Sequence, residues 1–287
     1  MQSVQIPVTG GMLHALRFGQ GPKVVLAAHG ITASAMSFSA VARHLPEGWS
    51  LLAVDLRGRG GSAGLPGPYG MDTHAADLAA AAEHLGAPVA LTGQSMGAYA
   101  ALRAAARRPE LFDRLVLIDG GLPLPLPAEF DPDQVLEATV GPAVARLHQT
   151  FPSVEAYVGF FRAHPALSAR WNDDMDAYVR YDAIGEAGAV RSRVSAEAVY
   201  ADGRDLLVGA EGFGDDLDKL AMPATLLYAP RGMLGEEPGM LPQPLVAHWA
   251  TRSPMVRPEL VADTNHYTIL MTDPAAELIA RRLTATA

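Results

Sequence analysis

Short and almost uninterrupted apolar runs recur through the first part of the chain, and each run ends in glycine or polar residues. They cover 23–30, 50–58, 88–95 and 114–121. Segments with helical patterning lie between them, at 35–45, 72–85 and 96–108. Strands buried on both faces of a parallel sheet have such continuous apolar runs. The alternation predicts a mostly parallel α/β sheet, with ligand chemistry at the carboxyl ends of its strands.

The pattern changes after residue 121. Residues 122–222 contain no comparable strand, and the proline-rich stretch LPLPLP at 122–127 predicts a stiff connector that is hostile to helices. The helical segments that follow are 134–150, 153–164, 173–181 and 195–208. Strand-like and helical segments then alternate again, at 224–230, 244–251, 257–263 and 274–282.

This change of pattern predicts the domain organisation. Two strands are expected within residues 1–21, before the first apolar run. We expect one α/β domain built from residues 1–121 and 223–287, with a helical insertion at 122–222. An insertion that joins two strand ends would cover the ligand site there. A separate helical domain with its own role is the alternative.

Composition limits the class of protein and its partners. Hydrophobic residues make up 49% and charged residues 18% of the 287 residues, which is typical of a folded chain. The net charge of −9 disfavours nucleic acid or an anionic membrane as partner. The absence of cysteine excludes disulfides and a cysteine nucleophile. No apolar run approaches the roughly 18 residues of a membrane span, and no signal-like segment opens the chain, so a cytoplasmic location is expected.

No cofactor or metal ion is expected. The pattern Gly-x-Gly-x-x-Gly does not follow the first apolar run, so a dinucleotide site is disfavoured. The histidines and acidic residues have no spacing typical of metal ligands.

A candidate nucleophile stands between a predicted strand and a predicted helix. The residues Gly93-Gln94-Ser95-Met96-Gly97 join the run 88–95 to the helical segment 96–108 and fit the pattern Gly-x-Ser-x-Gly. A nucleophile on such a sharp turn needs small neighbours, because its backbone is strained and the strand and helix crowd together. The helix N-terminus helps to stabilise developing negative charge. Ser95 is therefore the predicted nucleophile.

Two further features lie where a serine nucleophile needs them. His29-Gly30-Ile31 end an earlier strand, and the glycine lets the loop turn a backbone N–H toward the serine. The N–H groups of Ile31 and Met96 are the predicted oxyanion hole. His266 follows the strand-like run 257–263, late in the chain, and is the predicted general base.

The set of motifs resembles the α/β-hydrolase superfamily. The motifs are HG at 29–30, DLRGRGGS at 55–62, GQSMG at 93–97 and NHY at 265–267. The resemblance extends over the whole chain, and it places the helical insertion where the superfamily carries its cap. It implies the same roles for Ser95 and His266, and the same oxyanion donors, as the residues themselves suggest.

The acid that would orient His266 departs from the usual pattern. The superfamily usually places it just after the strand that follows the cap, but the loop PRGMLGEEPGML at 230–241 has Glu236 as its first acidic residue. Asp119 ends the strand before the cap, where some members keep the acid, and a rigid strand end suits this task. We expect Asp119, with Glu236 as the main alternative. Glu237 and Asp263 remain open.

These residues predict a hydrolase of carboxylic esters or lactones. An acyl-enzyme would form on Ser95, and the many Leu, Pro, Phe and Met residues of the insertion suggest a small apolar substrate. Serine in place of aspartate disfavours dehalogenases and epoxide hydrolases. A C–C bond hydrolase or a cofactor-free perhydrolase uses the same triad and stays open. A ligand receptor with slow or no turnover is the non-enzymatic alternative.

Overall fold

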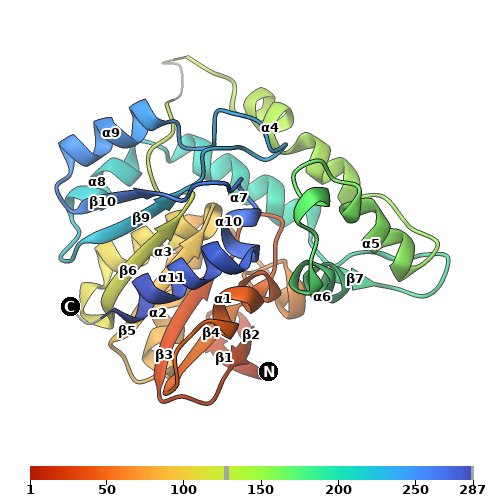
Figure 1. Ribbon diagram of the computed structural model, residues 1–287, viewed down its shortest axis with the longest axis horizontal. Helices are drawn as coiled ribbons and strands as arrows, with labels where there is room; N and C mark the ends of the chain where they lie inside the picture. The colour runs from red at the N-terminus through yellow and green to blue at the C-terminus, as the bar shows by residue number, and fades with distance from the viewer. Residues whose placement is uncertain (126–128, 286–287) are drawn as a thin grey trace.

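A central sheet of eight strands organises the computed structural model, which describes residues 1–125 and 129–285 (Figure 1). The strand order is β1-β2-β4-β3-β5-β6-β9-β10. The pairs β1–β2 and β2–β4 are antiparallel, and the other pairs in the sheet are parallel. The strands are β1 (Gln2–Val8), β2 (Gly11–Phe18), β3 (Lys23–Ala28), β4 (Trp49–Val54), β5 (Val89–Gln94), β6 (Phe112–Ile118), β9 (Ala224–Tyr228) and β10 (Val256–Leu260). The predicted fold class is confirmed.

Helices cover both faces of this sheet. Successive side chains of a strand point to opposite faces, so Leu26 and Leu52 pack with α2 and α3, whereas Val25 and Leu51 pack with α1 and α11. This double burial explains the unbroken apolar runs of the sequence. The helices on the sheet are α1 (Ser39–Arg43), α2 (Met71–His84), α3 (Met96–Arg107), α9 (Gln243–Arg252), α10 (Thr268–Met271) and α11 (Asp273–Thr284).

The chain between β6 and β9 is mainly helical. Its helices are α4 (Pro132–Leu147), α5 (Val154–Arg162), α6 (Asp173–Asp182), α7 (Ala196–Val208) and α8 (Gly212–Asp218), with a short hairpin of β7 (Ala183–Ile184) and β8 (Arg191–Ser192). Helix α4 packs on α7, and α5 packs on α6. Figure 1 shows α5 and α6 beyond the edge of the sheet layers.

Helix α8 was not predicted and belongs by its contacts to the helices on the sheet. The ring centroids of Phe213 and of Tyr99 in α3 lie 4.7 Å apart, and Arg103 Nε donates a hydrogen bond of 2.8 Å to Asp216. The predicted insertion 122–222 thus includes one helix that packs with the sheet domain.

Two other segments differ from expectation. The predicted helix at 35–45 is a 3₁₀ turn, η1 (Ala35–Phe38), followed by the single short helix α1. The predicted connector at 122–127 extends beyond the described residues; its described part, 122–125, is neither helix nor strand.

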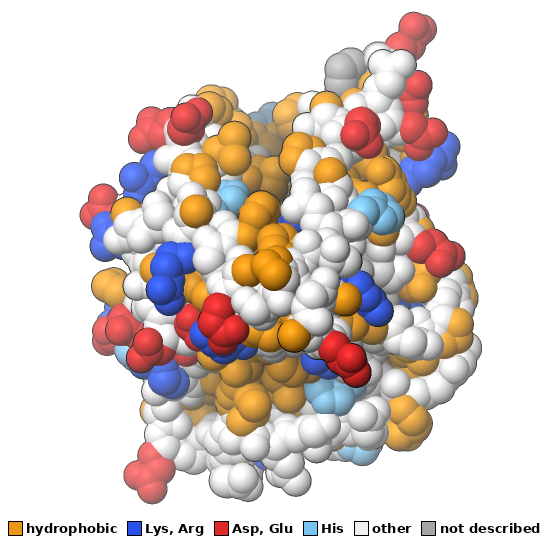
Figure 2. Space-filling view, turned by 90° about the vertical axis from the view of Figure 1, so that its right-hand side faces the viewer, with side chains coloured by type: hydrophobic (Ala, Val, Ile, Leu, Met, Phe, Trp, Pro, Cys, Tyr) orange, Lys and Arg blue, Asp and Glu red, His pale blue; other side chains and the backbone are white. Residues whose placement is uncertain are grey.

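Charged side chains of both signs are interspersed on the face that carries α5 and α6 (Figure 2). Arg180, for example, pairs with Asp176 and with Glu155 on this face. In the part of the chain that the structure describes, no helix combines the length and the apolar character needed to cross a membrane.

Candidate active site

Ser95 occupies a strained turn between β5 and α3. Its backbone has φ 54° and ψ −124°, a region that a residue with a side chain rarely adopts. The flanking glycines make the turn possible. A Cβ on Gly93 would lie 2.0 Å from the carbonyl oxygen of Gly97, and one on Gly97 would lie 2.1 Å from that of Ala28. The two glycines of the motif therefore have the steric role that the sequence suggested.

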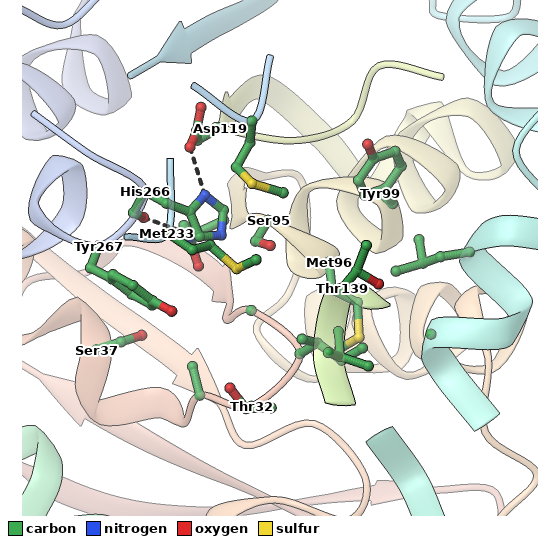
Figure 3. A pocket seen from close by; sticks show the side chains of 18 of the residues that line it. Thr32, Ser37, Ser95, Met96, Tyr99, Asp119, Thr139, Met233, His266 and Tyr267 are labelled. Carbon is green, nitrogen blue, oxygen red and sulfur yellow. Dashed lines mark hydrogen bonds and ion pairs between the residues drawn. The ribbon is translucent and has the colours of Figure 1, made fainter. Parts of the chain in front are cut away.

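His266 and Asp119 come together beside this serine (Figure 3). The Nδ1 atom of His266, in the loop between β10 and α10, lies 2.6 Å from Oδ2 of Asp119, and both side chains are buried. A carboxylate only accepts hydrogen bonds, so Nδ1 carries the proton and Nε2 is left free to accept one. Asp119 Oδ1 accepts a second hydrogen bond of 3.1 Å from the backbone of Ala229.

The other candidate acids lie apart from His266. Glu236 and Glu237 are exposed on the loop after β9, and Asp263 is exposed with φ 58°. No hydrogen bond joins any of them to His266 within the residues described. Asp119 is the carboxylate that contacts the imidazole.

Gln94, the residue before the serine, also contacts His266, a contact that the sequence did not predict. Its Nε2 donates a hydrogen bond of 3.1 Å to the carbonyl oxygen of His266 and lies 3.3 Å from the imidazole Nε2. An amide N–H next to Nε2 is consistent with an unprotonated nitrogen there. The only signal in the sequence was its place inside the Gly-x-Ser-x-Gly motif.

The peptide group that carries the Ile31 N–H is held by His29. His29 Nε2 accepts a hydrogen bond of 3.0 Å from the Leu56 N–H, so Nδ1 bears the proton and donates to the Gly30 carbonyl at 2.7 Å. Burial lowers the pKa of His29 to about 4, outweighing the opposite effect of Asp55. A neutral imidazole with a fixed tautomer thus orients the peptide bond between Gly30 and Ile31.

The second predicted oxyanion donor, the Met96 N–H, opens helix α3. The first N–H groups of a helix have no intrahelical acceptor and carry partial positive charge. Met96 lines the same cavity as Ser95 and Ile31. The two residues that carry the predicted donors thus line one cavity with Ser95, and the oxyanion hole stays a prediction.

A buried ion pair connects the loop after β4 with helix α7, and a hydrogen bond from the same arginine reaches the loop after β3. Arg59 Nε donates a hydrogen bond of 2.9 Å to the Ile31 carbonyl, while its Nη1 pairs with Asp202 of α7. Asp202 Oδ1 also accepts a hydrogen bond of 2.6 Å from the Gly70 N–H and lies 3.0 Å from Nε2 of the buried His74. The helical insertion is thereby fastened to the loop that carries Ile31.

The candidate residues open into one cavity of about 190 Å³ (Figure 3). Leucine and methionine side chains from both the sheet domain and the insertion line much of it. They are Met96, Leu124, Leu136, Leu206, Leu207, Met233, Met240, Leu241, Leu270 and Met271. Phe160 and Trp171, two large side chains of the segment between β6 and β9, are not among the residues that line it. In the described residues no cluster of three or more His, Asp or Glu side chains is arranged to hold a metal ion.

The fold and these motifs define the class of protein. Residues 23–270 match the model of the α/β-hydrolase fold family, so the chain belongs to this family. The predicted superfamily is thus confirmed.

Relatives of known activity include several kinds of hydrolase. The chain is 36% identical over 144 residues to N-formylmaleamate deformylase of Pseudomonas putida, a match that covers 47% of this chain and 54% of the deformylase. It is 38% identical over 114 residues to Lipase LipV of Mycobacterium tuberculosis, covering 39% of this chain and 43% of the lipase. These matches span about half the length of the two relatives. Esterase Rv0045c of Mycobacterium tuberculosis is 30% identical over 237 residues, 77% of this chain and 70% of the esterase.

Solved structures support the fold over the whole chain. The crystal structure of E-2-(acetamidomethylene)succinate hydrolase has a TM-score of 0.81 at 20% identity and covers 99% of both chains. The structure of the esterase Rv0045c has a TM-score of 0.72 at 24% identity, over 99% of this chain and 92% of that one. At these identities the likeness is one of fold.

Proposed function

We propose that this chain hydrolyses carboxylic esters or lactones of small apolar substrates, with Ser95 as the nucleophile. The observation that carries the proposal is the 2.6 Å hydrogen bond between Asp119 and His266, formed in the cavity that the strained Ser95 also lines. A base held by a carboxylate next to a serine on a strand-to-helix turn is the arrangement that acyl transfer requires.

The proposed mechanism follows from the positions of these groups. His266 Nε2 accepts the Ser95 hydroxyl proton as Oγ attacks the carbonyl carbon. The N–H groups of Ile31 and Met96 stabilise the tetrahedral oxyanion, and the proton on His266 passes to the departing alcohol oxygen. Water, deprotonated by His266, then attacks the acyl carbon. The bond to Ser95 Oγ breaks, Oγ takes the proton from His266, and the carboxylic acid is released. Asp119 keeps the imidazole in the required tautomer throughout.

The lining of the cavity supports an apolar substrate. Leucine and methionine side chains surround much of the space, and burial of apolar groups against them contributes about 25 cal/mol for each Å² removed from water. The insertion supplies part of this lining through Leu136 and Leu206. We propose that residues 122–222, apart from the packing of α8 on the sheet domain, act as a cap that selects the substrate.

Hydrolysis of an amide is the second candidate, and the similarity to the deformylase favours it. The name of that relative gives its substrate as an acid anion. In this chain the described residues that line the cavity include no Lys or Arg to pair with an anion. We therefore place neutral esters before carboxylate-bearing amides. C–C bond hydrolysis and perhydrolysis would use the same residues. A ligand receptor would bind its ligand in this cavity without hydrolysing it.

A panel of p-nitrophenyl esters and lactones of graded chain length tests the proposal. We expect turnover of the neutral members, labelling of the Ser95 peptide by a fluorophosphonate probe, and loss of both in Ser95→Ala. A formyl amide and a 1,3-diketone, which has a cleavable C–C bond, are included as competing substrates. Turnover of either one without ester hydrolysis would replace the ester assignment, and labelling of another serine would contradict the role of Ser95.

A further inference from the structure

One hydroxyl in the cavity wall is buried without a partner. Ser37, in the turn η1, is 2% exposed and lines the cavity. Its Oγ has no hydrogen-bond partner among the residues that the structure describes. Leaving a buried hydroxyl unpaired costs about 1–3 kcal/mol, so such groups are rare and call for a physical reason. A ligand that supplies the missing hydrogen bond is one such reason.

Two phenols line the same cavity. Tyr267 directly follows His266, and its ring packs edge-on against the imidazole with 5.6 Å between centroids. Tyr178 comes from helix α6 of the insertion. Burial raises the pKa of both phenols, so each keeps its proton and can donate it. Neither hydroxyl makes a hydrogen bond within the described part of the chain.

These hydroxyl groups lie on one side of the cavity. Ser37 and Tyr267 are seen on the His266 side in Figure 3, whereas Met96 and Thr139 lie beyond Ser95. The packing agrees, because Tyr178 and Tyr267 contact the hydrophobic cluster on one face of the sheet and Met96 belongs to the cluster on the other. Ser95 thus stands between a side with unpaired hydroxyl groups and a side lined by aliphatic residues such as Leu136. The hydroxyl groups of Tyr99 and Thr139 on the second side already donate to the carbonyl oxygens of Leu122 and Val135.

The charges around the hydroxyl groups favour a neutral ligand group. Asp119 places a carboxylate in the cavity wall. Arg146 is close enough to influence both phenols, but it is not among the residues that line the cavity. Its guanidinium donates to the Tyr157 hydroxyl at 2.8 Å and lies 3.9 Å from Asp182, which balances its charge. An anion in this place would find no Lys or Arg among the described residues that line the cavity.

We propose that Ser37, Tyr178 and Tyr267 form a hydrogen-bonding subsite for a neutral oxygen atom of the substrate, such as a carbonyl, ether or hydroxyl oxygen. The inference rests on the proposed function, since it deepens the description of the substrate. The substrate then has two unlike parts, an aliphatic part on the Met96 side of the scissile carbonyl and an oxygen-bearing part on the Tyr267 side. A purely aliphatic ester would leave the three hydroxyl groups without partners.

Matched ester pairs test this subsite. One member of each pair carries an ether oxygen or a ketone carbonyl, and the other member has a methylene group at that position. In one series this position lies in the acyl part of the ester, and in the other series it lies in the alcohol part. The wild-type protein should prefer the oxygen-bearing member in one series by about tenfold in kcat/KM, the effect expected of one net hydrogen bond. Ser37→Ala, Tyr178→Phe and Tyr267→Phe should each bring this ratio closer to one.

Ser34→Ala is the matched control. Ser34 Oγ is likewise buried without a partner among described residues, but Ser34 does not line the cavity. This variant should keep the wild-type ratio. An unchanged ratio in all three subsite variants would overturn the proposal, and so would a stronger preference for a carboxylate-bearing analogue than for the neutral one.

Binding measurements separate this inference from the proposed function. Titration calorimetry with non-hydrolysable ketone analogues of each pair reports on the subsite without turnover. In one outcome no ester is hydrolysed, but the analogue with the additional oxygen binds about tenfold more tightly than its methylene partner, and Ser37→Ala removes this difference. The subsite proposal then stands and the ester activity fails. If both ketones bind equally and esters are hydrolysed, the ester activity stands and the subsite fails.

Discussion

The carboxylate of Asp119 and the imidazole of His266 lie 2.6 Å apart although 147 residues separate them in the chain. The strand β9 and the residue after it hold Asp119 through two hydrogen bonds. Its N–H donates to the Leu227 carbonyl at 2.8 Å, and its Oδ1 accepts from the Ala229 N–H. The left-handed backbone of Asp119, with φ 47°, is stabilised by these contacts. The remaining oxygen is thereby directed at His266.

Asp119→Asn should reduce kcat by up to about 10⁴-fold while the protein stays folded. The amide keeps the shape of the carboxylate, but its NH₂ group can favour the wrong imidazole tautomer and cannot stabilise an imidazolium. Glu236→Gln is the matched control, because Glu236 is exposed and makes no contact with His266, and it should keep its activity. Kinetics on one ester, with circular dichroism of both variants, would decide. The reverse result would assign the acid to the loop after β9.

Ser95→Gly should stabilise the protein by about 1 kcal/mol while abolishing ester hydrolysis. Glycine adopts φ 54° without the steric penalty that a Cβ incurs, and this strain costs on the order of 1–3 kcal/mol. Part of the gain is lost because glycine makes the unfolded chain more flexible. Ser95→Ala removes the hydroxyl but keeps the Cβ, so it should be equally inactive without the added stability. Urea unfolding of the three proteins measures the difference, and equal stability of the Gly and Ala variants would argue against strain at the serine.

Local patterns predicted the sheet and the crowded turn around Ser95 well, because these depend on neighbours in sequence. Runs buried on both faces identify parallel strands, and the crowded turn around Ser95 demands glycine at fixed positions. Helix α8 was missed since its sequence GFGDDLD is short and rich in glycine and aspartate, which are poor helix formers. Its stability comes from packing on α3, including the contact of Phe213 with Tyr99.

Long-range partners were beyond the reach of such patterns. Arg59 and Asp202 are separated by 143 residues, and nothing near either residue indicates the other. The choice between Asp119 and Glu236 likewise depended on which strand end faces the loop of His266. Ser37 sits in no motif, and only its burial in the cavity wall draws attention to it. The residues that depend on tertiary contacts are those that the sequence left open.

His29 should make the protein less stable as the pH falls from about 6.5 toward 4. Its pKa is about 4 in the folded state and near 6.5 in the unfolded state, so only the unfolded chain takes up the proton in this window. The contribution of His29 to the free energy of unfolding is fully present above pH 6.5 and is lost as the pH falls toward 4. Between pH 7.5 and pH 5 the loss should be about 2 kcal/mol.

His29→Gln is the comparison for this effect. A glutamine can still bond to Gly30 and Leu56 but does not titrate, so the variant should lose about 2 kcal/mol less than wild type over the same interval. Urea denaturation at both pH values provides the measurement. The pKa of Asp55 and of Asp202 is lowered below 3.8, so their contributions are lost at still lower pH. Parallel stability changes in the two proteins would show that His29 does not carry the effect.

Asp202→Ala should destabilise the protein by about 3–5 kcal/mol, because it leaves the fully buried Arg59 without its counter-charge. The exposed pair of Arg204 and Asp133 also involves α7, which it joins to α4, and Asp133→Ala should change stability by less than about 1 kcal/mol. Thermal and urea unfolding of both variants give the comparison. Equal, small effects would mean that Arg59 finds another partner or reaches water when Asp202 is removed.

Leu136→Ala should shift the substrate preference toward longer aliphatic chains, by roughly two carbon atoms, since it removes most of a side chain that lines the cavity. Gly203→Ala should act in the opposite direction. A Cβ on Gly203 would lie 2.4 Å from Leu136 Cδ1 and would push that side chain away, into the cavity that both residues line. The measurement is kcat/KM over an ester series of graded length, at a temperature where each variant is folded. Phe160→Ala is the control, because Phe160 belongs to the same insertion but is 42% exposed and does not line the cavity. If the insertion selects the substrate, the preferred chain length shifts in opposite directions in Leu136→Ala and Gly203→Ala and stays unchanged in Phe160→Ala. The same length preference in the wild-type protein and all three variants would leave the insertion without that role.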